Sequence, residues 1–232
     1  MKAVILAGGL GTRLRPFTQV VPKPLLPIGE SSVLEIQLQR LKKCGFDQIY
    51  FATNYKADYI ARFFGDGSHM GVKIKYSKEE QPLGTAGPLS LLRGDLIEPF
   101  LVMNGDILTL IDFAKMHAAA ADKGAALTVA IKRHITPFAF GNIFFEGDYI
   151  TGIEEKPDIV RYILAGIYIL TPAIFEYIPH AQPYGMDQLI RSMLAAGRPV
   201  AKYEFYEYWL DIGQITDYEK TTEIAQYFRD ED

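Results

Sequence analysis

The first half of the chain alternates short apolar runs with segments in which apolar residues recur at helical spacing. Leu34 and Leu38 lie on one helical face, and Gly45 follows as a stop signal. Ser32 and Glu35 have the spacing of an N-terminal capping box. The pattern predicts strands at 2–7, 48–53, 72–76 and 99–103, a helix that begins after Ser32, and further helices at 57–64, 85–92 and 113–121.

The second half is richer in strand patterns. Gly147 and Asp148 have the composition of a hairpin turn between two such segments. The pattern predicts strands at 126–132, 142–146, 149–155, 163–170 and 200–205, and helices at 186–196 and 216–228. Alternating strands and helices favour an α/β fold with a mixed, mostly parallel central sheet covered by helices. We expect one domain over 1–232, with two halves that meet near residue 125.

Composition narrows the class of protein but does not identify it. The 232 residues are 49% hydrophobic, which suits one sizeable domain with a core. A net charge of −4 with dispersed basic residues argues against nucleic acid as a partner, and no apolar run approaches a membrane span. The single cysteine, Cys44, excludes an internal disulfide and a cysteine-based zinc site. We therefore expect a cytoplasmic protein that makes no membrane contact.

A glycine-rich run at 6–16 follows the first predicted strand. Glycine lets the backbone approach a ligand closely, so that successive N–H groups converge on phosphate oxygens. Arg13 and Lys23 add positive charge on either side of such a cradle. The run lacks the Gly-Lys-Ser/Thr of a Walker loop and the third glycine of a dinucleotide fingerprint. The competing interpretation is a tight turn with two solvated cations, and Thr12 beside Arg13 makes it less favoured.

This run resembles the signature of the sugar nucleotidylyltransferases, the NDP-sugar pyrophosphorylases. Further segments stand in that family's order at 81–87, 104–106, 154–157, 165–168 and 209–213. The resemblance implies a Rossmann-like α/β/α sandwich with a nucleotide-binding half at 1–125. A sugar-phosphate-binding half at 126–232 would hold a small β-rich insertion for the acceptor substrate. It also implies a sugar-1-phosphate nucleotidylyltransferase, which transfers a nucleotidyl group from an NTP to a sugar 1-phosphate and releases pyrophosphate.

The resemblance assigns roles residue by residue. It implies that Arg13 stabilises the departing pyrophosphate and that Lys23 lies between the α-phosphate and the incoming phosphate. The implied nucleotide-binding residues are Ala7, Gly8, Gly9, Gly11, Thr12, Gln81, Gly84, Thr85 and Ala86, and the implied sugar-phosphate residues are Asn104, Gly141, Glu155, Lys156 and Gly166. No general base is required, because a phosphate monoester is already largely anionic at neutral pH.

Asp106 and Asp211 are the implied ligands of Mg²⁺, each after a predicted strand. Mg²⁺ commonly takes one or two carboxylates together with substrate phosphates. Taken alone, Asp211 fits a turn or cap ahead of the last helix better than a metal ligand. Lys156 belongs to a charged run that is usually a solvated turn. Only their positions in the family pattern favour a functional role.

The nucleobase and the sugar are left open. The segment 83–87 most resembles guanylyltransferases that act on mannose or manno-heptose 1-phosphates, with Gln81 as the base-reading amide. Thymidylyl or uridylyl transfer to glucose-, GlcNAc- or MurNAc-type 1-phosphates is the alternative. The segment 184–189 departs from the aspartate-rich pattern of many relatives, which puts sugar contacts there in doubt.

A different class is a non-catalytic regulatory subunit that binds nucleotide sugars. Such a subunit would be expected to lose the charged residues Arg13, Lys23, Asp106 or Asp211, and all four are present. The expected partners are therefore an NTP and a sugar 1-phosphate, and homo-oligomerisation is left open.

Overall fold

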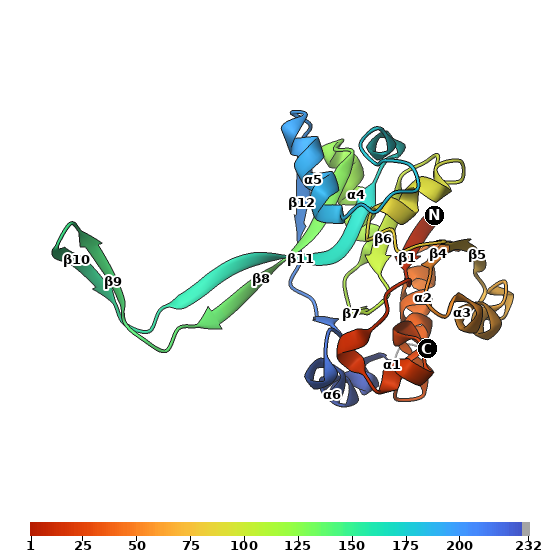
Figure 1. The fold of residues 1–232 in the computed structure, drawn as a ribbon, viewed down its shortest axis with the longest axis horizontal. Helices are drawn as coiled ribbons and strands as arrows, with labels where there is room; N and C mark the ends of the chain where they lie inside the picture. Colours follow the sequence, from red (N-terminus) through yellow and green to blue (C-terminus); the bar gives the residue numbers. More distant parts are fainter. Residues whose placement is uncertain (229–232) are drawn as a thin grey trace.

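A seven-stranded sheet forms the centre of the computed structural model, which describes residues 1–228 (Figure 1). Only β11 runs antiparallel to its neighbours in the sheet. The mixed, mostly parallel sheet predicted from the sequence is thereby confirmed. The strands lie in the order β12 (Val200–Glu204), β8 (Leu127–Pro137), β11 (Asp158–Leu170), β6 (Phe100–Asn104), β1 (Lys2–Leu6), β4 (Gln48–Thr53) and β5 (Lys73–Lys78).

Helices cover both faces of the sheet. Because successive strand residues point to opposite faces, Ala3 and Ile5 of β1 join one core cluster and Val4 joins the other. The first cluster packs against α2 (Val33–Lys43), α3 (Ala57–Phe64) and α4 (Phe113–Lys123), and the second against α5 (Met186–Ala195) and the 3-10 helices at Gly87–Leu92 and Pro172–Glu176. The predicted capping box is present, since Ser32 and Glu35 exchange hydrogen bonds of 3.2 and 2.7 Å.

The helix predicted at 85–92 differs from the expectation. It is a 3-10 helix that begins at Gly87. The backbone N–H groups of Ala86 and Gly87 both donate to the carbonyl of Tyr184 at 2.9 Å, and Pro88 stands in the first turn. These hydrogen bonds fix the conformation of the backbone at 86–87, so that an α-helical turn does not form there.

Short elements bring the end of the chain back to the sheet. The β7 strand (Ile107–Thr109) pairs with β13 (Trp209–Asp211), after which α6 spans Ile215–Ile224 and a 3-10 turn follows at Ala225–Phe228. Residues 229–232 of the predicted domain lie outside the described residues. The remaining short elements are α1 (Phe17–Val20), β2 (Pro27–Ile28), β3 (Ser31–Ser32), and 3-10 turns at Thr12–Leu14, Lys23–Leu25 and Ser68–Met70.

Residues 132–164 form an arm that extends away from the body (Figure 1). The β8–β11 ladder continues outward from the pair Ile131–Leu164 to the pair Pro137–Asp158. Beyond it, β9 (Asn142–Glu146) and β10 (Tyr149–Glu154) form a hairpin that turns at Gly147, where φ is 59°. The insertion is thus β-rich as expected, but both strands that carry it are longer than predicted.

Within residues 1–228, no helix has both the length and the apolar character that a membrane crossing requires.

Candidate active site

A cavity of about 460 Å³ opens at the carboxyl ends of β1 and β6. In open α/β sheets this is the edge at which ligands bind. The residues that line it come from the glycine-rich run, the 3-10 turn at Lys23–Leu25, the segment after β5, the end of β6 with the residues that follow it, and the turn after β13. They are Leu6, Gly8, Gly9, Leu10, Gly11, Thr12, Arg13, Lys23, Glu79, Pro82, Gly84, Thr85, Asn104, Asp106 and Gly213.

The glycine-rich run forms a backbone cradle at one end of this cavity. Gly11 has a φ of 61° and precedes the 3-10 turn at Thr12–Leu14. A left-handed residue followed by a right-handed one makes successive N–H groups converge, which is the geometry of an anion-binding nest. A side chain at Gly11 would place its Cβ only 2.7 Å from Thr18 Cγ2. Both φ and packing therefore require glycine at this position.

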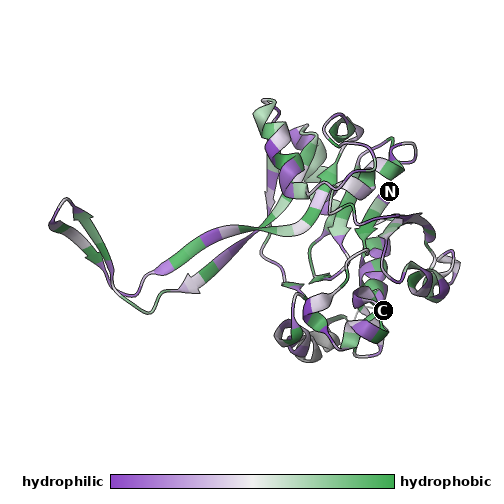
Figure 2. Cartoon of the chain, in the orientation of Figure 1, coloured by the Kyte–Doolittle hydropathy of each residue, from purple (hydrophilic) through white to green (hydrophobic). Residues whose placement is uncertain are grey.

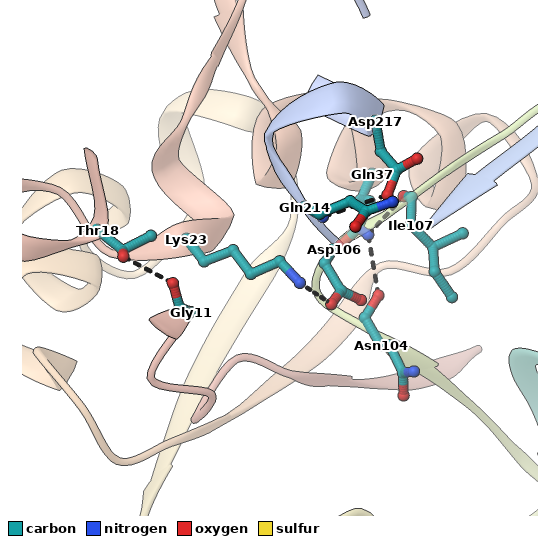
Figure 3. Close-up of polar contacts among 9 residues, drawn as sticks. All are labelled: Gly11, Thr18, Lys23, Gln37, Asn104, Asp106, Ile107, Gln214 and Asp217. Carbon is teal, nitrogen blue, oxygen red and sulfur yellow. Dashed lines mark hydrogen bonds and ion pairs between the residues drawn. The ribbon is translucent and has the colours of Figure 1, made fainter. Parts of the chain in front are cut away.

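A lysine and two aspartates meet beside this cradle. Lys23 is 9% exposed, and its ammonium forms an ion pair with Asp106 Oδ2 (Figure 3). The β7–β13 pairing sets Asp211 opposite Ile107, the residue that follows Asp106. Asp106 directly precedes β7 and Asp211 ends β13, so the two carboxylates lie at the same end of the pair.

The charges in this cluster act on one another. Asp211 is open to solvent on one side, but the protein atoms around its carboxyl desolvate it and raise its pKa above the ordinary value. The negative charge of Asp106 raises that pKa further, while the positive charges of Lys23 and Arg13 act in the opposite direction. Arg13 extends to the turn after β13, where its Nη1 lies 3.5 Å from the position that a Cβ on Gly213 would occupy. Residues from both ends of the chain therefore build one charged site.

Two buried oxygen atoms at the cavity have no hydrogen-bond partner in the described structure. They are Asp106 Oδ1 and Asn104 Oδ1. The backbone that carries them is held in place by Gln37, whose Nε2 donates to the carbonyls of Asn104 at 3.1 Å and Ile107 at 2.8 Å (Figure 3). Unpaired buried acceptors on a fixed backbone indicate a place for a cation or a donor from a ligand.

The donor set suits Mg²⁺. Asp106 offers a free buried oxygen, and Asp211 provides a second carboxylate that is partly desolvated. Mg²⁺ needs one or two carboxylates when substrate phosphates supply further oxygens. Within the described part of the chain, there is no group of three or more His, Cys, Asp or Glu residues that could hold a metal ion.

Gly166 of β11 adjoins Asn104. Its φ is 68°, and a Cβ there would lie 2.7 Å from Asn104 Nδ2 and 2.7 Å from Ile107 Cδ1. The register of the β8–β11 ladder also shifts between Leu164 and Tyr168. The structure therefore brings Gly166 to the site, with its backbone in close contact with the Asn104 side chain.

The predicted nucleotide-binding residues divide into two groups. Gly84 and Thr85 line the cavity together with the glycine-rich run. Ala7 and Ala86 are buried in the two core clusters, and exposed Gln81 lines a separate cavity of about 590 Å³. The side chains of Ala7 and Ala86 therefore pack in the core next to the site and do not line the cavity.

Glu79 and Gly213 line the cavity although neither was among the predicted site residues. Glu79 is buried, which raises its carboxyl pKa, and its Oε2 accepts a hydrogen bond from the Leu83 N–H at 2.8 Å. Its position just after a strand that ends at the sheet's carboxyl edge is the signal that could have found it. Gly213 closes the 209–213 segment, whose resemblance was noted without a role for this glycine.

Gly141, Glu155 and Lys156 lie on the arm and do not line the cavity. They are nevertheless close together. A Cβ on Gly141 would lie 3.2 Å from Glu155 Oε2, and Lys156 Nζ lies 4.0 Å from Glu155 Oε1. The predicted sugar-phosphate site is therefore in two parts, one on the body around Asn104 and one on the arm.

The nucleotidyl transferase family model matches residues 2–226. The chain belongs to this family. The match covers both halves of the sheet and the arm, in accord with the resemblance noted from the sequence.

Relatives with known names and structures agree with the family. The chain is 35% identical over 226 residues to the mannose-1-phosphate guanylyltransferase catalytic subunit beta of Danio rerio, covering 94% of this chain and 62% of that protein. It therefore spans about three fifths of the length of the curated relatives that it matches.

Two solved structures share the fold. A Bacillus anthracis protein assigned as a glucose-1-phosphate thymidylyltransferase and crystallised with sucrose has a TM-score of 0.81 at 26% identity, covering 100% of this chain and 96% of that one. HddC from Yersinia pseudotuberculosis complexed with GMP-PN has a TM-score of 0.73 at 27% identity, covering 96% of this chain and 98% of that one.

Proposed function

We propose that this chain transfers a nucleotidyl group from an NTP to a sugar 1-phosphate, forming an NDP-sugar and pyrophosphate. The observation that carries the proposal is the cavity that Arg13, Lys23 and Asp106 line together with the glycine cradle. Asp211 does not line the cavity, but it lies close enough for these three charges to act on its carboxyl. A site that binds several phosphates needs cationic side chains that neutralise the phosphate oxygens, and carboxylates that hold a metal ion.

The residues present support a mechanism based on alignment and electrostatics. The acceptor phosphate is largely anionic at neutral pH, so its oxygen attacks the α-phosphorus without a general base. The cradle at Gly11 and Thr12 holds the triphosphate, and Arg13 stabilises the pyrophosphate as its negative charge increases. Buried Lys23 holds the two reacting phosphates close together and offsets their repulsion.

Asp106 and Asp211 would hold Mg²⁺. The ion, when bound, would neutralise phosphate charge and polarise the reacting phosphoryl oxygen. In the protein alone, the Lys23 ammonium pairs with Asp106 Oδ2, while Oδ1 of the same carboxylate has no partner within the described residues. One carboxylate therefore positions the lysine and keeps an oxygen available for the metal.

GTP is the nucleotide that we favour, with a mannose- or manno-heptose-type 1-phosphate as acceptor. The segment 83–87 supports this choice, as do the name of the Danio rerio relative and the GMP-PN ligand of HddC. The thymidylyltransferase assignment of the Bacillus anthracis neighbour supports the alternative, transfer from dTTP or UTP to a glucose-type acceptor.

A regulatory subunit without activity is disfavoured, because the four charged residues are retained and their side chains act on one another. A cytoplasmic location remains a prediction, supported by the single cysteine.

Product analysis tests the proposal. The chain is incubated with Mg²⁺, equimolar GTP, UTP, dTTP, CTP and ATP, and a panel of sugar 1-phosphates, and the NDP-sugars are weighed by mass spectrometry. We expect a dominant GDP-sugar. A dominant pyrimidine product would refute guanylyl transfer and leave nucleotidyl transfer standing, whereas no NDP-sugar from any pair would overturn the proposed function.

A further inference from the structure

The arm exposes more apolar surface than a two-stranded ribbon can keep in water. Phe140, Phe145, Tyr149, Ile150 and Ile153 are each more than 65% exposed. Figure 2 shows hydrophobic stretches along the hairpin, which lies away from the body. Isolated two-stranded hairpins are marginally stable, and contiguous apolar surface of this kind marks an interaction site. The exposed apolar side chains therefore favour an interaction role for the arm.

The arm also presents two open strand edges. β12 pairs with β8 only as far as Ile131, and β6 pairs with β11 only from Ile167 onward. Beyond these points, in the described chain, the outer edges of β8 and β11 have no neighbouring strand. Open edges of this length readily accept another strand.

The bend between the ladder and the hairpin holds a small group of polar residues. Gly141, Glu155 and Lys156 meet there, and Lys156 has a φ of 48°. A lysine in the left-handed region is uncommon, and such backbone strain gathers at binding sites. The side chains of Lys156 and Glu155 are both 68% accessible, and their contact with each other is loose, so both charges are open to a ligand.

The cavity of the body is lined without any residue of the arm. The cavity has Asn104 on its acceptor side with an unpaired buried oxygen, and no residue of the arm lines it. The β8–β11 ladder extends from the body to Asp158 with one register shift between Leu164 and Tyr168, and in the structure it carries the bend away from its own cavity (Figure 1).

We propose that two copies of this chain exchange their arms, so that each arm brings Gly141, Glu155 and Lys156 to the acceptor side of the other copy's cavity. This inference rests on the proposed function. A second copy is the occupant that the observations favour, because it supplies at once the missing strand edges, an apolar surface of the same kind and the cavity that lacks this group. The same contact made twice about a twofold axis closes the assembly.

Subunit complementation tests the exchange. Lys156→Met disables the arm and leaves the body intact, whereas Arg13→Ala disables the body and leaves the arm intact. The two variants are co-expressed with different affinity tags, and tandem purification recovers only hybrids. In an exchanged dimer, the intact arm of one chain meets the intact body of the other. The hybrid is then expected to have about half the activity of the wild-type dimer, while each parent variant alone has little.

Three results would overturn the inference. Tandem purification could recover no hybrid, which shows that the chain does not self-associate through any surface. The hybrid could be recovered but remain as inactive as its parents, which shows that each arm serves its own body. The parent Lys156→Met could also match the wild type. Lys73→Met is the matched control, because Lys73 is an exposed lysine on the edge strand β5, and it should leave the activity unchanged.

A second measurement separates this inference from the proposed function. The double variant Phe145→Lys and Ile150→Lys charges two facing residues of the hairpin. By light scattering we expect wild-type dimers to become monomers, and Ile97→Lys, at a 69% exposed position on the body, to remain dimeric. An unchanged mass in the hairpin variant would refute the exchange, even if the wild type had no activity with any NTP. If the wild-type protein is active but monomeric, the proposed function stands and the arm exchange is refuted.

Discussion

Replacing Asp211 with asparagine should change activity and stability in opposite directions. The carboxylate is partly desolvated and lies beside Asp106, and both effects raise its pKa. A raised pKa means that the folded protein disfavours the charged form. The fold therefore loses stability as pH rises from the ordinary aspartate pKa through the raised one. A neutral amide at this position would remove the free-energy cost of holding a desolvated negative charge beside Asp106. Asp211→Asn should therefore raise the Tm of the metal-free protein at neutral pH.

The same substitution should remove most of the activity. One lost metal ligand at a site of concentrated phosphate charge should lower kcat at least about a hundredfold, which corresponds to about 2.7 kcal/mol. Wild-type stability should also rise when Mg²⁺ and a non-hydrolysable NTP bind. At about a hundred times the dissociation constant this linkage contributes about 2.7 kcal/mol, or a Tm increase of about 5–11 °C for a domain of this size.

Thermal melts and initial rates together provide the assay. Melts are recorded with the NTP analogue in Mg²⁺ and in EDTA, and rates are measured across pH. Wild-type activity should fall as pH decreases through the raised Asp211 pKa, because the protonated carboxyl no longer binds the metal. Asp122→Asn, on the exposed side of α4, serves as the matched control. Our reasoning is refuted if Asp211→Asn retains both the Mg²⁺-dependent increase in Tm and a near wild-type rate.

Three further predictions concern other parts of the site. Arg13→Ala should chiefly lower kcat, because its proposed partner gains charge as pyrophosphate departs, while Arg15→Ala should not; steady-state kinetics would contradict this if only KM rose. Gly166→Ala should lower the Tm more than Gly124→Ala, since both have positive φ but only Gly166 has neighbours within 2.7 Å, and equal melts would exclude a steric effect. Gln81→Ala should reduce the GTP preference more than the rate with GTP; unchanged competition between NTPs would remove Gln81 from base recognition.

The body of the site follows from local rules that a sequence displays. The apolar run at 99–103 predicts a strand that places Asn104 and Asp106 at its carboxyl end, and the structure agrees. The helix that follows is capped by another residue, Asp112, whose side chain accepts from the Lys115 N–H at 2.9 Å. Gly11 was predicted from the need for close backbone approach, and its φ of 61° agrees.

Other features depend on contacts that no local pattern encodes. The place of Glu79 after β5 is visible in the sequence, but its contacts are not: Asn54 Nδ2 donates to its carbonyl at 3.0 Å, and the Leu83 N–H donates to its carboxylate at 2.8 Å. Asp211 meets Asp106 only through the β7–β13 pair, whose strands are three residues each. The length of the arm was missed because its outer strands lack a buried face, and so lack the regular apolar alternation by which strands are predicted.

The thirteen-residue strand β11 links two distant parts of the molecule. One end forms the outer edge of the arm, and the other lies in the centre of the sheet, with Gly166 between them beside Asn104. The arm is carried by β8 and β11 together, but only β11 also pairs with β6, the strand that ends at Asn104. The register shift between Leu164 and Tyr168 interrupts the β8–β11 ladder where Gly166 lies. The strand therefore joins the arm to the sheet at a residue that also adjoins Asn104 in the site.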